Sequence, residues 1–83
     1  MNLLSGDRSV LRRVSPKKLL QSKWTAMSPV DRELHFVVTR IVRKHTPAGP
    51  IERVELTAVY TGRASTLDWR ELNDVGRWRP GWH

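Results

Sequence analysis

The sequence predicts a mainly β fold: a small antiparallel meander of three to four strands curled toward a half-barrel, with short helical turns and one short C-terminal helix. Apolar and β-branched residues alternate with period two in two long segments, which is the pattern of half-buried strands. A loop containing two prolines and a glycine separates the two segments and predicts a hairpin. A chain of 83 residues has room for one core.

The strongest strand candidates are residues 33–44 and 51–61. Alternation in 33–44 predicts two faces, one with Leu34, Phe36 and Val38 and the other with His35, Val37, Thr39 and Ile41. In 51–61 it aligns Val54, Leu56, Ala58 and Tyr60. Shorter strands are expected at 22–27, with Trp24 and Ala26 on one face, and at 65–67.

Helical turns are predicted at 16–21 and 29–32, because each segment begins at the proline of a Ser-Pro pair. At the first, Ser15 serves as N-cap and Pro16 takes the first helical position. A helix over 69–75 follows from Asp68 and Glu71 at capping-box spacing and from Gly76 as a C-terminal cap. Residues 79–82, Arg-Pro-Gly-Trp, match a type II turn that would fold Trp82 back toward Trp78.

The net charge of +7 is unevenly placed. Residues 1–30 hold six basic side chains and one acidic one, whereas residues 31–83 hold nine and seven. We therefore divide the chain into a flexible basic arm, 1–14, and a single small β-rich domain, 15–83. The charge excess indicates a polyanionic partner, and a solubilising tail is the alternative.

The expected cellular location follows from three features that the sequence lacks. The sequence has no cysteine, so it can form no disulfide and offers no thiolate nucleophile. No apolar run approaches the roughly 20 residues of a membrane span. The early pair Leu3-Leu4 is too short for a signal-peptide core. We expect a cytoplasmic protein without a membrane span.

Several short elements resemble those of a known family. They are Pro16-Lys17-Lys18-Leu19-Leu20, Ser22-Lys23-Trp24-Thr25-Ala26, Arg32-Glu33 with His35-Phe36, Trp69-Arg70-Glu71-Leu72 with Asp74, and Trp78 with Pro80-Gly81-Trp82. Together they resemble the small tryptophan-rich conserved hypothetical bacterial proteins, a domain of unknown function, from about residue 15 to 82. The resemblance implies no activity, substrate or catalytic residue.

Four tryptophans in 83 residues carry the main functional hypothesis. Trp24, Trp69 and Trp78 each have a basic neighbour in sequence, and single-strand binders combine aromatic rings with cations. The alternative is that a small domain needs large apolar groups for its core. Trp24 and Trp69 fall on inward faces and are predicted to be core, whereas Trp78 and Trp82 are either a packed lid or an exposed contact.

We therefore predict a non-catalytic module that binds RNA or single-stranded nucleic acid. Its expected contact residues are Lys17, Lys18, Lys23, Arg77, Trp78, Arg79 and Trp82. The alternative is an adaptor that docks on an acidic protein surface, because tryptophan and arginine dominate interface hot spots.

No residue pattern predicts catalysis or a cofactor. Asp68, Glu71 and Asp74 line one edge of the expected helix and could hold a hard cation, but capping and pairing with nearby arginines explain them. His35 is expected to be structural, beside Glu33 or a residue of the next strand. The sequence has neither a Ser–His–Asp order nor a glycine-rich phosphate loop. We expect no enzyme, no metal and no cofactor.

Overall fold

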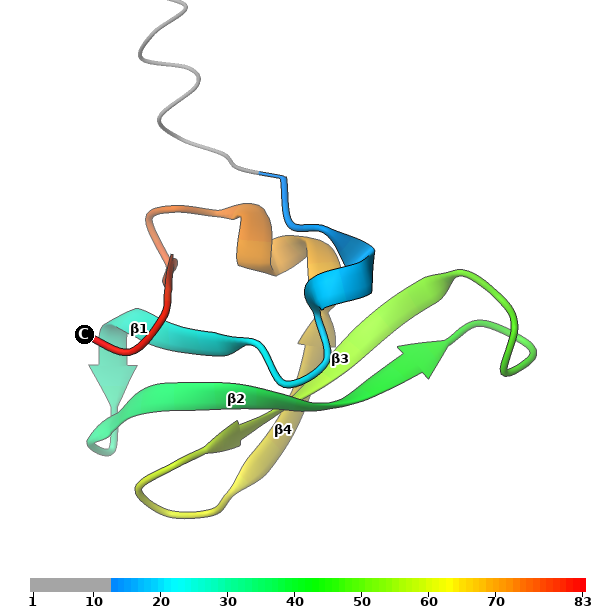
Figure 1. Cartoon of the computed structure of the whole chain (residues 1–83). Coiled ribbons are helices and arrows are strands. Elements are labelled where there is room, and N and C mark those ends of the chain that lie inside the picture. Colours follow the sequence, from blue (N-terminus) through cyan, green and yellow to red (C-terminus); the bar gives the residue numbers. More distant parts are fainter. Residues whose placement is uncertain (1–12) are drawn as a thin grey trace, which may run out of the picture.

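A computed structural model describes residues 13–83. Within that range the chain forms one antiparallel sheet and two short 3-10 turns (Figure 1). The elements are η1 (Pro16–Lys18), β1 (Lys23–Val30), β2 (Glu33–Arg43), β3 (Ile51–Ala58), β4 (Ala64–Asp68), η2 (Trp69–Asn73) and β5 (Trp78–Pro80). The mainly β prediction is confirmed, with five strands in this range where three to four were expected.

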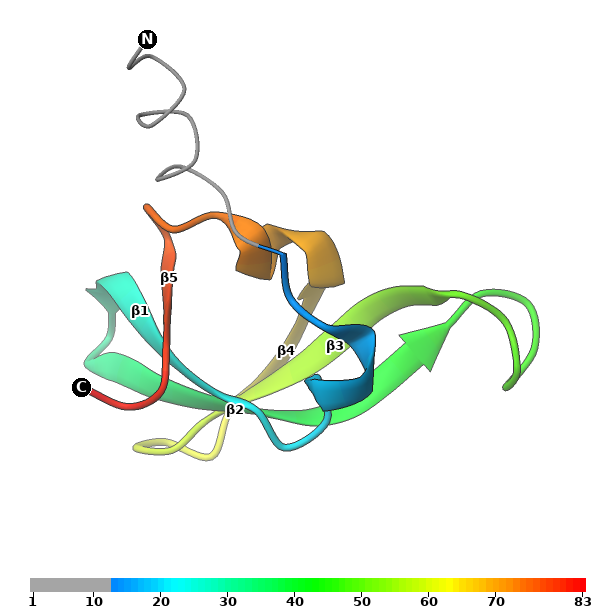
Figure 2. The ribbon, with the colours of Figure 1, turned by 45° about the horizontal axis from the view of Figure 1, so that its top comes forward.

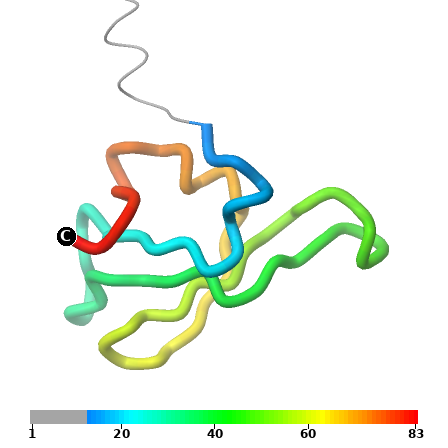
Figure 3. The backbone as a smooth tube through the Cα atoms, viewed as in Figure 1, coloured from blue at the N-terminus to red at the C-terminus, as the bar shows by residue number. Residues whose placement is uncertain are grey.

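The strand order is β4-β3-β2-β1-β5. Strands β1 to β4 follow one another as a meander, and the predicted hairpin loop joins β2 to β3. After β4 the chain passes through η2 and returns to the opposite edge, where β5 pairs with β1 (Figure 3). The sheet is not closed, because β4 and β5 form its two edges.

The core lies between one face of the sheet, here called the inner face, and the two 3-10 turns, which lie on that side (Figure 2). Leu19 follows η1 and Leu72 belongs to η2, and both are fully buried. Their partners in the core are Trp24, Phe36, Val38, Val54, Leu56, Ala58 and Trp78. The predicted inward facing is confirmed for Trp24, Phe36, Val38, Val54, Leu56 and Ala58. It is wrong for Tyr60, which lies past the end of β3 and is 67% exposed.

Ile41 departs from the predicted alternation. It was placed on the same face as His35, but it packs against the core. The register between β2 and β3 shifts between Val38 and Arg40, so one extra residue stands in β2 at Thr39. Such a bulge reverses the facing of every residue that follows it.

The helical turn predicted at 29–32 is wrong. Pro29 belongs to β1, and Asp31 and Arg32 form the two-residue turn of the β1–β2 hairpin. Both have positive φ, 56° and 64°, as a type I′ turn requires. The register shifts between Thr25 and Val30, so the proline lies in an irregular part of the strand, where its missing N–H is tolerated.

The C-terminal helix predicted over 69–75 is also wrong. Residues 69–73 form a 3-10 turn, and no α-helix occurs among residues 13–83. Asp68 caps this turn as predicted, since its Oδ1 accepts the Arg70 N–H at 2.9 Å. Asp74 then takes extended backbone, and its carboxylate accepts the Gly76 N–H at 2.9 Å, which ends the helical path.

Three capping predictions are wrong. Gly76 is not the C-terminal cap, because the C-cap of η2 is Asp74 and Gly76 does not have the positive φ of a left-handed cap. Ser15 occupies the N-cap position of η1 with extended backbone, but its side chain makes no capping hydrogen bond. Glu71 does not complete a capping box. Its carboxylate instead accepts a hydrogen bond from Arg77 at 2.7 Å.

Truncating Leu56 tests the placement of the core. Its side chain is 1% exposed, whereas Val59, just past the same strand, is 51% exposed. We expect Leu56→Ala to lower the free energy of unfolding by about 2–5 kcal/mol, because it leaves a cavity. Val59→Ala should change it by about 0.5 kcal/mol or less. Urea unfolding followed by tryptophan fluorescence measures both, and equal losses would contradict the assignment of the inner face.

Candidate nucleic-acid interface

The two C-terminal tryptophans lie on opposite faces of the sheet. In the pairing of β5 with β1, Trp78 stands opposite Ala26 and points into the core. Its ring meets Phe36 edge-on, with centroids 5.3 Å apart. Trp82 is 42% exposed, against 8% for Trp78. The structure therefore places Trp78 in the packed core and leaves Trp82 as the exposed ring of this pair.

The segment after β5 crosses to the outer face of β1 and β2, the face opposite the core. The chain bends at Gly81, whose φ of +84° suits glycine, but Pro80 belongs to β5 and the bend does not carry Trp82 to Trp78 as predicted. The Gly81 N–H donates to the Lys23 carbonyl at 2.8 Å, and the Thr25 hydroxyl donates to the Gly81 carbonyl at 2.8 Å. The Trp82 indole N–H donates to the Phe36 carbonyl at 2.9 Å, which fixes the ring.

Cationic and aromatic groups surround the fixed ring. The Lys23 ammonium lies 4.9 Å from the centroid of Trp82, within the range of a cation–π contact. The His35 ring lies 5.8 Å away at 31°, and its Nε2 is 2.8 Å from the main-chain oxygen of His83, the last residue of the sequence. Arg79 pairs with Thr25 and shares its outward face. We call Lys23, His35, Arg79 and Trp82 the outer-face cluster.

The seven predicted contact residues do not form one site. Lys23, Arg79 and Trp82 are brought together on the outer face, whereas Trp78 is buried. Lys17 and Lys18 are exposed on η1, which lies on the side of the inner face (Figure 2). Arg77 is held by Glu71.

His35 is the member of the cluster that sequence reasoning missed. Its facing was predicted correctly, but its expected neighbours were Glu33 or residues of β3. It lies instead opposite Thr25 and beside Trp82. Trp82 reaches His35 only because β5 pairs with β1, and no local sequence pattern predicts that pairing.

Charge is compensated unevenly over the surface. Among residues 13–83, the ion pairs engage four arginines: Arg40, Arg63, Arg70 and Arg77. Lys23 and Arg79 have no carboxylate within ion-pair distance in this part of the chain. The outer-face cluster thus presents an exposed ring and two cations without an ion-pair partner among the described residues, of which Lys23 contacts the ring.

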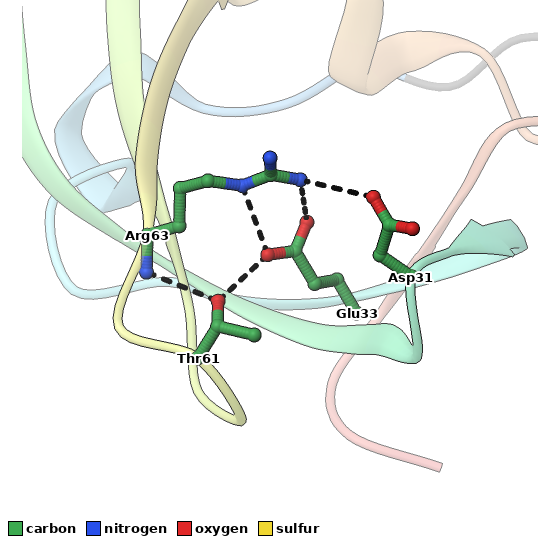
Figure 4. Close-up of polar contacts among 4 residues, drawn as sticks. All are labelled: Asp31, Glu33, Thr61 and Arg63. Carbon is green, nitrogen blue, oxygen red and sulfur yellow. Dashed lines mark hydrogen bonds and ion pairs between the residues drawn. The ribbon is translucent and has the colours of Figure 1, made fainter.

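A buried carboxylate ties the two hairpins together (Figure 4). Glu33 is 7% exposed and receives hydrogen bonds from Arg63 Nη2 at 2.6 Å and Nε at 3.1 Å. The Thr61 hydroxyl donates to the same group at 2.6 Å, and Arg63 also lies 3.6 Å from Asp31. The hydrogen bonds from Arg63 and Thr61 lower the pKa of Glu33 below its usual value. A carboxylate so fully engaged is a structural link between the β1–β2 turn and the β3–β4 loop.

The acidic residues of η2 are likewise engaged. Asp68 and Asp74 accept backbone N–H groups and Glu71 accepts from Arg77. No cluster of three or more potential metal ligands occurs within the described 13–83 range. In the same range, the helical segments are too short to cross a membrane.

The family model of a tryptophan-rich protein, DUF2389, matches residues 22–83. The chain belongs to this DUF2389 family. The match covers all five strands, η2 and the whole outer-face cluster, whereas Lys17 and Lys18 precede it. The predicted family is thus confirmed over most of the chain. Neither the curated proteins nor the solved structures contain a significant match.

In this DUF2389 chain, the link through Glu33 predicts a loss of stability in acid. The pKa of Glu33 is lower in the folded than in the unfolded chain. Ionised Glu33 therefore contributes fully to folding stability at a pH above its pKa in the unfolded chain, near 4.5. The contribution is lost as the pH falls through the lower, folded value. Glu33→Gln should therefore lower the melting temperature by several degrees at pH 7 and by much less near pH 3.

Glu52→Gln is the matched control, since no ion pair or side-chain hydrogen bond of Glu52 occurs among residues 13–83 and the same charge is lost. Thermal unfolding of the three proteins from pH 7 to pH 3 measures the difference. A Glu33→Gln penalty that stays constant over this range would contradict the assignment.

Proposed function

We propose that this DUF2389 chain is a non-catalytic, cytoplasmic module that binds RNA or other single-stranded nucleic acid on the outer-face cluster. The observation that carries the proposal is Trp82, an exposed ring that its own N–H holds beside Lys23, with Arg79 on the same face of the sheet. The proposal keeps Lys23, Arg79 and Trp82 of the predicted contact residues and adds His35.

The cluster supplies both parts of single-strand recognition. A base stacked on a tryptophan contributes about 1–3 kcal/mol whatever its identity, because every base has a π-face. Phosphates on either side of a stacked base need cations close to the ring, and the ammonium of Lys23 lies 4.9 Å from it. Because the hydrogen bond to Phe36 already orients Trp82, this side chain loses little conformational entropy when a ligand binds.

An adaptor for an acidic protein surface is the alternative interpretation. Carboxylates would satisfy Lys23 and Arg79 but would give the exposed face of Trp82 no ring to stack on. Nucleic acid offers phosphates and rings at adjacent positions, which matches an indole with Lys23 beside it and Arg79 on the same face. The combination therefore favours nucleic acid over an acidic protein.

Affinity for a fluorescein-labelled twelve-nucleotide oligouridine, measured by anisotropy, tests the proposal. Trp82→Leu should weaken binding by about tenfold or more, the loss of one stacked base. The double variant K23Q/R79Q should weaken it and reduce the slope of log K against log salt by about 1.4, from about 0.7 for each phosphate contact. The control R32Q/R40Q removes the same charge elsewhere and should have a smaller effect.

Two outcomes would overturn the proposal. One is the absence of binding by the native chain at low ionic strength. The other is an equal loss in both double variants, which would indicate nonspecific attraction to the net charge. A single stoichiometric protein recovered by pull-down, unaffected by nuclease, would support the adaptor instead.

A further inference from the structure

A second concentration of basic residues surrounds a cleft that shares no residue with the outer-face cluster. The cleft is open to solvent, has a volume of about 540 Å³ and lies between η1, the loop end of the β2–β3 hairpin and η2. Arg43 and Lys44 line it from the end of β2, and Trp69 and Arg70 line it from η2, with Pro16 and Pro50 beside them. Its volume is within the 300–1,000 Å³ usual for small-molecule sites.

The charge of the cleft is positive throughout. Three of its lining residues are cations and none is acidic. Arg43 donates from Nη1 to the Gly49 carbonyl at 3.0 Å, a neutral acceptor that leaves its charge uncompensated. Arg70 faces Asp68 through Nε at 3.4 Å, and its side chain remains 68% exposed. Lys44 has no carboxylate within ion-pair distance among residues 13–83.

The walls of the cleft are held in place by backbone contacts. The Lys44 N–H donates to the Pro50 carbonyl at 2.9 Å and closes the loop of the β2–β3 hairpin. A side chain at position 49 would collide with the Lys44 carbonyl oxygen, so only glycine permits this closure. On the other wall, Trp69 packs partly against the core. The backbone thus holds Trp69, Arg43 and Arg70 around one opening.

We propose that this cleft binds a ligand of the nucleotide class. Its phosphate would lie among Arg43, Lys44 and Arg70, whose donors suit phosphate oxygens. Its planar base would lie against Trp69 and the neighbouring prolines. The size of the cleft favours one nucleotide over an acidic peptide, which would supply charge without a flat ring. This site is independent of the proposed binding of single-stranded nucleic acid to the outer-face cluster.

Titration of the full, isotope-labelled chain with adenosine monophosphate tests the inference by amide chemical shifts. Shifts are expected at Lys44, Trp69 and Arg70, with apparent affinity at least about tenfold higher than for adenosine or inorganic phosphate alone. Each of those probes lacks one half of the predicted contacts. Adenosine or phosphate matching the monophosphate, or no shift at these residues with millimolar monophosphate, would overturn the inference.

Matched variants separate this site from the outer face. R43Q/K44Q should weaken adenosine monophosphate binding at least about tenfold. R70Q, which leaves the hairpin intact, should also weaken it, whereas K23Q/R79Q should leave it unchanged. Oligouridine binding should instead be weakened more by K23Q/R79Q than by R43Q/K44Q. If the native chain bound adenosine monophosphate but not oligouridine, only the outer-face proposal would be refuted. Equal losses of monophosphate binding in R43Q/K44Q and K23Q/R79Q would refute the proposed nucleotide site in the cleft.

Discussion

The pairing of β5 with β1 is the contact on which the rest of the structure depends. It carries a three-residue strand across to the far edge of the sheet and inserts Trp78 beside Phe36. The same pairing sets the start of the turn at Gly81, and that turn delivers Trp82 to the outer face. One short strand therefore completes the core on one side and builds the candidate interface on the other.

Much of the fold follows from alternation in the sequence. The long strands, the facing of Trp24, Phe36 and Leu56, and the cap at Asp68 were all predictable, because each depends on residues close together in the chain. The β1–β2 turn was not, since Asp31-Arg32 lacks the glycine or asparagine that usually marks such a turn. β5 was missed because three residues ending in proline carry no period.

In the candidate interface, the rings and cations that lie together are not neighbours in the sequence. Lys23-Trp24 and Trp78-Arg79 were each read as a ring with its own cation. In a strand, neighbouring side chains point to opposite faces, so both tryptophans go inward while their basic neighbours go outward. Lys23 serves the distant Trp82 instead. Cations and rings that are 59 residues apart in sequence meet only through the sheet.

Fluorine NMR of the chain labelled with 5-fluorotryptophan tests most directly whether Trp82 is the contact ring of the outer face. Substitution of each tryptophan assigns its resonance. On addition of oligouridine at low salt, the Trp82 resonance should move while those of Trp24 and Trp78, both in the core, stay in place. A stationary Trp82 resonance under conditions where binding occurs, or equal movement of the two core rings, would contradict the account.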